Sequence, residues 1–109
     1  MRQHVKFIET RLFTRQITSL ASDEEYRLLQ ESLLRRPAHG DLIKDTGGLR
    51  KLRWGERSRG KRGGLRVIYY WHVERELFLM LYVYSKSEQK DLTATQKKAL
   101  ADAVRKEFK

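Results

Sequence analysis

The sequence contains no cysteine, which excludes a disulfide framework and a thiolate metal site. Proline occurs only once, and no apolar run approaches the roughly 20 residues that a membrane helix needs. The first residues include Arg2, His4 and Lys6 where a signal peptide would have an apolar run. These absences predict a cytoplasmic protein without a membrane segment.

Acidic residues are also in deficit. The 109 residues include 24 Lys or Arg and 14 Asp or Glu, which gives a formal net charge of +10. A chain of this length is expected to form one domain, residues 1–109, around one core. The positive excess favours an anionic partner, most often nucleic acid, because a positive field steers association and phosphate contacts release counterions.

The first part of the chain predicts a strand followed by two helices. Residues 4–9 alternate apolar and polar side chains, as a short strand does. Apolar residues then recur every three or four positions, as on one face of a helix. Ser22 and Glu25 form a capping box that opens a second helix, and Pro37 ends it.

The second part predicts three strands and a final helix. Residues 41–45 are expected to be a polar connection. Residues 49–54, 65–71 and 76–84 are then predicted strands, and the last is apolar on both faces, which is typical of a central strand. A second capping box at Thr93 opens a C-terminal helix.

A cationic stretch joins the first two of these strands. The sequence Gly-Gly-Leu-Arg at residues 47–50 recurs at residues 63–66. From Arg50 to Arg66 inclusive there are eight Lys or Arg and one acid, Glu56. This pattern predicts a basic β-hairpin.

Alternation along the hairpin separates its side chains into two sets. Leu52 and Trp54 point to the core face, and Lys51 and Arg53 point to the other face. Pairing with the return strand can bring Arg66 beside them on a rigid sheet. Such a cluster would bind a phosphodiester.

Other catalytic constellations are not indicated. The chain has no cysteine nucleophile, and His4, His39 and His72 have no metal-ligand spacing. The histidines are therefore interpreted as structural or solvated. The acids fall mostly in a capping segment and on helix surfaces, so a carboxylate pair for acid and base catalysis is not predicted.

The cationic cluster is able in principle to cleave RNA without a metal. The ribose 2′-hydroxyl attacks its own phosphorus, and the protein must move two protons and stabilise phosphoryl charge. Clustered cations depress a lysine's pKa, so Lys51 is a candidate proton acceptor, with Arg53 and Arg66 as the phosphate clamp. The alternative is that Lys51 and Arg53 only keep an exposed strand soluble.

Three segments carry a resemblance to a known family. The runs GGLRKLRW at 47–54, GKRGGLRVIYYW at 60–71 and LYVYSKSEQKDL at 81–92 resemble the HigB branch of the RelE-type toxins of bacterial toxin–antitoxin pairs. The resemblance covers nearly the whole chain, including SDEEYRLLQ at 22–30. It implies an α+β, RelE-like fold: an N-terminal strand, two helices, a three-stranded antiparallel segment of a curved sheet, and a C-terminal helix.

The same resemblance implies a function. RelE-type toxins are mRNA endonucleases that cut within the ribosomal A site during translation, and they need no metal or organic cofactor. A cognate antitoxin, typically a helix-turn-helix protein encoded beside the toxin, neutralises them, so contact with DNA is expected only through the antitoxin. The family's catalytic basic residues correspond here to Lys51, Arg53 and Arg66.

Two positions depart from the family pattern. The arginine after the last strand and the tyrosine at the start of the final helix align with Ser87 and Thr93. Tyr84, as a base-stacking ring, and Lys86 and Lys90, as cations, are candidates to replace them. The alternative for Tyr84 is a place in the core or at the end of the sheet. The cations of the hairpin loop are further candidates to bind RNA, and their alternative role is to keep the loop soluble. The full set of RNA-binding candidates is Arg50, Arg57, Arg59, Lys61, Arg62, Tyr84, Lys86 and Lys90.

Three functions from different classes remain open. The preferred one is a ribosome-dependent mRNA endonuclease. The others are a ParE-like toxin of the same fold with DNA gyrase as its target, which does not rely on this basic cluster, and a noncatalytic RNA or ribosome binding module. For the first, replacing Arg66 by Ala is expected to abolish cutting and leave the fold intact, because Arg66 is predicted to lie on a solvated face.

Overall fold

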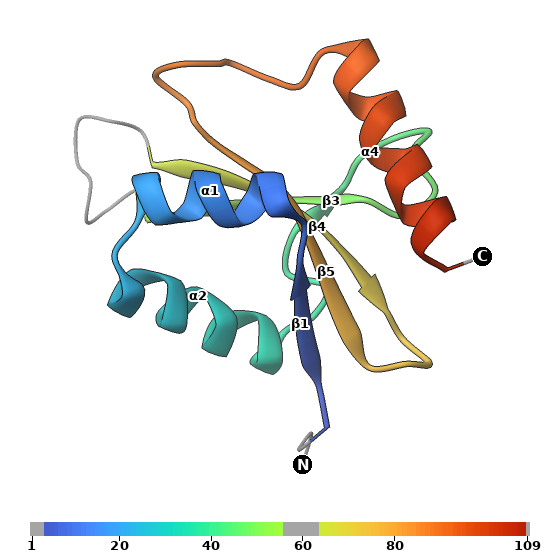
Figure 1. The fold of residues 1–109 in the computed structure, drawn as a ribbon, viewed down its shortest axis with the longest axis horizontal. Helices are drawn as coiled ribbons and strands as arrows, with labels where there is room; N and C mark the ends of the chain where they lie inside the picture. The colour runs from blue at the N-terminus through green and yellow to red at the C-terminus, as the bar shows by residue number, and fades with distance from the viewer. Residues whose placement is uncertain (1–3, 56–63, 109) are drawn as a thin grey trace.

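The computed structural model describes residues 4–55 and 64–108 (Figure 1). None of the helices within these two ranges has the length and apolar character required to cross a membrane. The elements in chain order are β1 (Lys6–Glu9), α1 (Arg11–Leu20), α2 (Asp23–Arg35), β2 (Asp41–Leu42), β3 (Arg50–Trp54), β4 (Leu65–His72), β5 (Leu77–Ser85) and α4 (Ala94–Glu107).

A mixed five-stranded sheet in the order β1-β5-β4-β3-β2 forms the centre of the protein. β1 runs parallel to β5, and the other neighbours are antiparallel. The predicted α+β class and the antiparallel segment of β3, β4 and β5 are confirmed. As predicted, the doubly apolar strand β5 has a neighbour on each side.

One strand was wrongly predicted as a connection. Asp41 and Leu42 form β2, which pairs with Lys51 and Arg50 at the edge of the sheet. Both residues of β2 are exposed. A two-residue exposed edge strand has no apolar alternation, so the sequence gives no signal for it.

Polar caps define where the helices begin. At α2, the Ser22 hydroxyl accepts from the Glu25 amide at 3.0 Å, and the Ser22 amide donates to the Glu25 carboxylate at 2.8 Å. At α4, Thr93 and Gln96 make the same reciprocal pair. Both predicted capping boxes are therefore confirmed.

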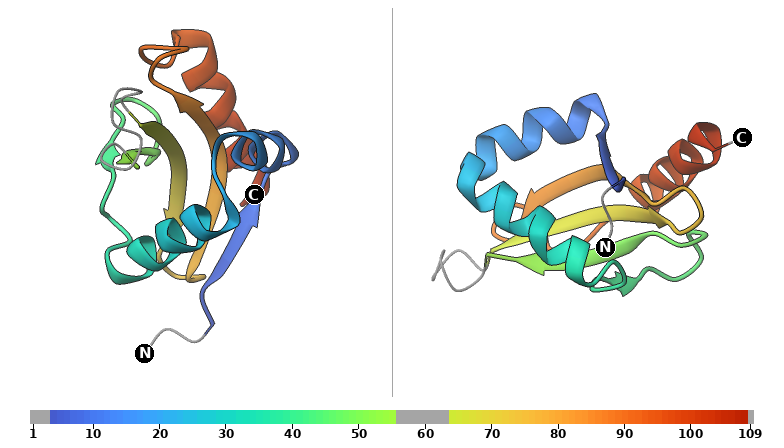
Figure 2. Two further views of the ribbon diagram at one scale, coloured as in Figure 1. Left: turned by 90° about the vertical axis from the view of Figure 1, so that its left-hand side faces the viewer. Right: turned by 90° about the horizontal axis from the view of Figure 1, so that it is seen from below.

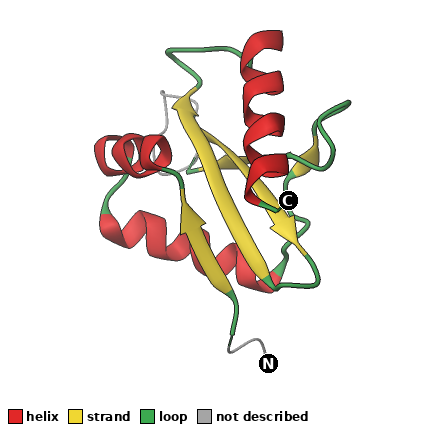
Figure 3. Ribbon diagram, turned by 45° about the vertical axis from the view of Figure 1, so that its right-hand side comes forward, coloured by secondary structure: helices red, strands yellow, loops and turns green. Residues whose placement is uncertain are grey.

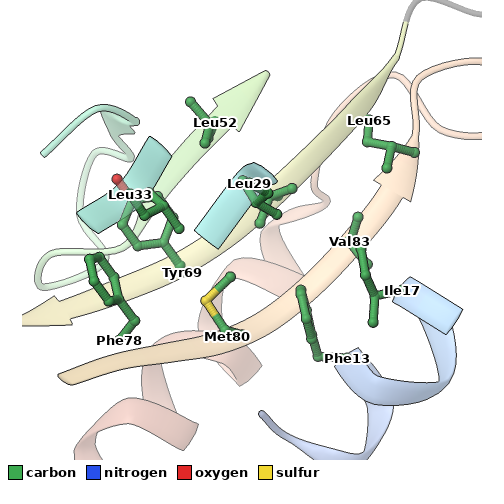
Figure 4. Close-up of a cluster of buried hydrophobic side chains, with 11 residues drawn as sticks. Phe13, Ile17, Leu29, Leu33, Leu52, Leu65, Tyr69, Phe78, Met80 and Val83 are labelled. Carbon is green, nitrogen blue, oxygen red and sulfur yellow. The ribbon is translucent and has the colours of Figure 1, made fainter. Parts of the chain in front are cut away.

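Helices α1 and α2 cover one face of the sheet (Figures 2 and 3). Phe13 from α1 and Leu29 and Leu33 from α2 are fully buried against Tyr69 of β4 and Phe78 of β5 (Figure 4). Burying a large apolar side chain contributes about 1.5–3 kcal/mol, so this layer fixes β4 and β5 firmly.

Helix α4 packs on the opposite face (Figure 3). Its Ala101 and Val104 contact a second apolar cluster that includes Ile68 of β4 and Leu79 of β5. An irregularity in the pairing of β4 with β5 lies between Ile68 and Tyr69. The sheet is therefore buried on both faces in its middle, and the polar residues of β3 lie beside the part that α4 covers.

Candidate nucleic-acid interface

Alternation along β3 directs its cations away from the α1/α2 core. Leu52 is 4% exposed in that core, whereas the Lys51 side chain is 31% exposed and Arg53 is exposed. Lys51 and Arg53 are two residues apart and therefore share the face of the sheet on which α4 packs. The predicted division of this strand is confirmed.

Arg66 of β4 is the register partner of Arg53. Directly opposed side chains of an antiparallel pair have Cβ atoms about 4.5–5.5 Å apart, and like charges in that position repel. An anion bound between two such arginines converts the repulsion into attraction. The hairpin thus brings Lys51, Arg53 and Arg66 onto one face.

Arg66 does not lie on a solvated face, contrary to the prediction. It is 4% exposed, because β4 is an interior strand between β3 and β5 and Tyr84 of β5 is its partner on the other side. Its guanidinium Nη1 donates to the Leu65 carbonyl at 3.4 Å. Arg66 therefore contributes to packing as well as to charge.

The three cations line a groove with a volume of about 500 Å³. Lys86 and Lys90 reach it from the connection between β5 and α4, and Lys97 reaches it from α4. Among the described residues, the charged groups lining this groove are six cations and two acids. The remaining lining residues are His39, Leu42, Ile43 and Leu52, and the two acids are Asp41 and Asp91.

Asp91 makes a salt bridge across the groove. Its Oδ1 lies 3.1 Å from the Lys51 Nζ and also accepts from the Leu92 amide at 2.8 Å. The Leu92 amide, followed by Lys51, holds the pKa of Asp91 below its usual range. The carboxylate is thus ionised at neutral pH and forms an ion pair with Lys51, one of the cations of the groove.

A network of polar side chains holds the connection that carries Asp91. Gln89 donates to the Asp91 carbonyl at 2.9 Å and to the Gln96 carboxamide oxygen at 2.6 Å. The Tyr82 hydroxyl of β5 bonds to both glutamine side chains. Through these bonds the connection is fixed to β5 and to the first turn of α4.

Arg50 is turned toward the backbone. Its Nη1 donates to the carbonyl oxygens of Gly40 at 2.7 Å and Ala38 at 3.4 Å. It does not line the groove, unlike Lys86 and Lys90. The four cations expected to bind RNA in the hairpin loop, Arg57, Arg59, Lys61 and Arg62, lie outside the described residues.

Tyr84 is placed inside the protein. It is 4% exposed in the cluster under α4, so its ring has no free face for a base in this conformation. Its buried hydroxyl has no hydrogen-bond partner within the described ranges. Burial, followed by the negative charge of Asp91, raises the pKa of this hydroxyl.

The two positions that depart from the family pattern have local structural roles. Ser87 bonds to Ser85 through both its hydroxyl, at 2.7 Å, and its amide, at 3.2 Å. The Thr93 hydroxyl accepts the Gln96 amide as the N-cap of α4. Neither residue lines the cationic groove.

Four lining residues with ionisable side chains were not found from the sequence: His39, Asp41, Asp91 and Lys97. Asp91 lies 40 residues from Lys51 in the chain, so no local pattern connects them. Lys97 directly follows the capping box of Thr93 and Gln96, a pattern that indicates only where a helix begins. His39 and Asp41 lie beside β2, the strand that the sequence did not indicate.

Fold and site together define a class of protein: a small α+β domain with helices on both faces of a mixed sheet and a cationic groove beside β3. No protein-family model matches the sequence. Among solved structures, the chain is similar to a double arginine-to-alanine mutant of the E. coli toxin RelE in its free state, with a TM-score of 0.62 and 12% identity. The match covers 94% of this chain and 98% of that one. The chain therefore has a RelE-like fold.

Proposed function

We propose that this protein is the toxin of a toxin–antitoxin pair and that it cleaves mRNA on the ribosome, in the manner of the HigB branch of the RelE-type toxins. The observation that carries the proposal is the row of Lys51, Arg53 and Arg66 along one groove of a RelE-like fold. The partners implied are mRNA in the ribosomal A site and a cognate antitoxin of the helix-turn-helix type.

The groove matches the demands of RNA cleavage by the 2′-hydroxyl. The scissile phosphate gains charge on its non-bridging oxygens as the 2′-oxygen attacks, and preorganised donors stabilise that charge. Arg53 and Arg66 face each other from two paired strands, which gives a planar, bidentate clamp for a phosphate. Lys51 supplies a third positive charge beside them.

The surrounding lysines suit a longer single strand. Lys86, Lys90 and Lys97 extend the positive charge from the sheet to α4. Contacts with phosphates position a nucleic acid without reading its sequence. The groove therefore supports binding of RNA through its backbone, and the ribosome is the partner that would select the codon.

Cell-free translation of one defined message tests the proposal. With the protein added, we expect new 5′ ends within codons that occupy the A site, and none when ribosomes are omitted. The variant Lys51→Ala/Arg53→Ala, which alters only groove-lining side chains of β3, should leave the message intact. Co-expression with the product of an adjacent helix-turn-helix gene should abolish cutting.

Other outcomes would assign the protein to another class. Halted translation with an intact message indicates a noncatalytic ribosome binder. An unaffected message together with altered DNA supercoiling indicates a gyrase-directed toxin of the same fold. Cleavage without ribosomes indicates a general ribonuclease.

A further inference from the structure

Arg53 and Arg66 can hold a phosphate, but they cannot take a proton, because arginine stays protonated in proteins. In its salt bridge with Asp91, the Lys51 nitrogen is an ammonium and has no lone pair to accept a proton. The proposed reaction still needs a base for the 2′-hydroxyl. Histidine is the side chain whose ordinary pKa lies closest to neutral pH.

His39 lines the same groove as these cations. It is half-buried, and its Nδ1 lies 3.3 Å from the Ser32 hydroxyl of α2. In the tautomer in which the Nδ1 hydrogen is donated to the Ser32 hydroxyl, Nε2 carries the lone pair and is the ring nitrogen left to accept a proton. A hydrogen bond to one ring nitrogen orients the ring and selects the tautomer, as in other sites that use histidine for proton transfer.

The backbone around His39 is fixed by two strands. The buried Tyr69 hydroxyl donates to the Pro37 carbonyl at 2.7 Å and accepts from the Gly40 amide at 2.9 Å. Arg50 donates to the Gly40 carbonyl at 2.7 Å. Side chains of β3 and β4 therefore clamp both sides of the residue, which is how a rigid scaffold holds a reacting group.

Glycine is required next to His39 for this clamp. A Cβ added at Gly40 would lie 2.9 Å from Tyr69 Cε1 and 3.1 Å from the Lys51 backbone carbonyl. The chain thus passes so close to β3 and β4 that only glycine fits. This close approach places His39 near Asp41 and Lys51, which also line the groove.

We propose that His39 is the general base of the RNA cleavage proposed above, on which this inference rests. Nε2 takes the proton of the 2′-hydroxyl as the 2′-oxygen bonds to phosphorus. The bond from phosphorus to the 5′-oxygen breaks, and that oxygen keeps the electron pair and takes a proton from the Lys51 ammonium. The products are a 2′,3′-cyclic phosphate and a 5′-hydroxyl.

The charges around the histidine set the electrostatics of this step. The groove presents Asp41 from β2 and Asp91 from the connection before α4, together with the six cations of β3, β4, that connection and α4. This net positive field favours a bound phosphate. A neutral imidazole is the form that can act as a base.

The test is single-turnover cleavage on ribosomes programmed with a defined message, from pH 6 to 8.5. The wild-type rate should rise with pH and then level off. His39→Gln should cut at least about 100-fold more slowly, and its rate should no longer fall toward low pH, the acid limb of the profile. Added imidazole should restore part of its rate. Ser32→Ala, which keeps the histidine and removes its hydrogen bond, should give an intermediate rate.

The matched control is His72→Gln. His72 packs against Phe108 at the other end of the sheet and does not line the groove, so its variant should behave as the wild type. A His39→Gln protein that keeps the wild-type rate or the acid limb overturns the inference. So does one that loses ribosome affinity while its rate at saturation is unchanged, since the ring would then be a phosphate ligand.

The two proposals fail in different ways. If the wild-type protein cuts no message, both fall. If Lys51→Ala/Arg53→Ala loses cutting and His39→Gln does not, the nuclease assignment stands and only the histidine's role falls.

Discussion

At the scale of single residues, the site is built from charges that are held by different means. Arg66 is packed inside the sheet, Lys51 is paired with Asp91, and Arg53 is exposed. Side chains that are already ordered lose little entropy when a phosphate binds. Arg66 and Lys51 are therefore the preorganised members of the cluster, and Arg53 is the one that must be ordered by the ligand.

The burial of Arg66 changes what its replacement should do. We expect Arg66→Ala to lower the cutting rate by about 10²–10³-fold, as loss of one transition-state donor does. It should also lower the thermal midpoint, because the long side chain is buried and its truncation leaves a cavity. Arg66→Met, which keeps most of the volume, should restore the midpoint but not the rate.

Rates and melting curves of both variants check this prediction. The control is Arg75→Ala, an exposed arginine stacked over Phe108 and away from the groove. Wild-type cutting by Arg66→Met would remove the guanidinium from the mechanism.

Asp91 places a negative charge where a phosphate is expected to bind. Asp91→Asn keeps an acceptor for the Leu92 amide and removes the charge, so RNA affinity should rise by up to about fivefold, equivalent to ~1 kcal/mol. Stability should fall by less than ~1 kcal/mol, because the pair with Lys51 is partly exposed. Weaker RNA binding by the variant would mean that Asp91 positions Lys51 for the ligand.

The pH dependence of this pair has a definite sign. Because the pKa of Asp91 is lowered in the folded state, its contribution is present above the ordinary aspartate pKa of about 3.9 and is lost as pH falls through the folded value. The unfolding free energies of wild type and Asp91→Asn should therefore converge in acid. Denaturant titrations at pH 7 and at pH 3 measure this convergence.

At the scale of secondary-structure elements, one carboxylate joins the three N-terminal elements. Glu9, the last residue of β1, accepts from Thr14 of α1 and from Tyr26 of α2, both at 2.6 Å. β1 is short and lies at the edge of the described sheet beside β5, so these bonds help to fix it against the helices. They lie on the side of the sheet opposite the groove.

Tyr26→Phe should cost about 1.5–3 kcal/mol of unfolding free energy at pH 7, since a hydrogen bond to a charged group is lost. Burial, and then Glu9, raise the pKa of Tyr26 in the folded state. The stability it provides is thus complete below the ordinary tyrosine pKa of about 10 and is lost as pH rises above it. The variant should lose less stability between pH 7 and 10.5 than the wild type.

Chemical denaturation at both pH values checks this, with Tyr70→Phe on the other face of the sheet as the control. Equal alkaline losses in wild type and Tyr26→Phe would contradict the assigned cause. Cutting should be unchanged at temperatures at which the variant is folded, because Tyr26 is remote from the groove.

Elements with strong local signals were predictable from the sequence. The capping boxes at Ser22 and Thr93 and the alternation around Leu52 depend on neighbours a few residues apart. The salt bridge of Lys51 with Asp91 and the burial of Arg66 depend on how distant elements pack, so no spacing in the sequence reports them. The same is true of His39, whose place is set by Tyr69 and Arg50.

At the scale of the whole molecule, a net charge of +10 has two possible effects on RNA binding. A diffuse positive field speeds association with any polyanion. A built groove adds direct phosphate contacts, each of which releases counterions. The two effects can be separated by moving the same amount of charge to different places.

Replacing Lys86, Lys90 and Lys97 together by Gln removes three charges from the groove. If each contacts a phosphate, the slope of log affinity against log salt for single-stranded RNA should fall by about 2, because each contact contributes about 0.7. The matched variant replaces Lys6, Lys98 and Lys106, which are exposed and do not line the groove. It has the same net charge and should keep nearly the wild-type slope, whereas equal slopes for the two variants would show that the overall field, and not the groove, binds RNA.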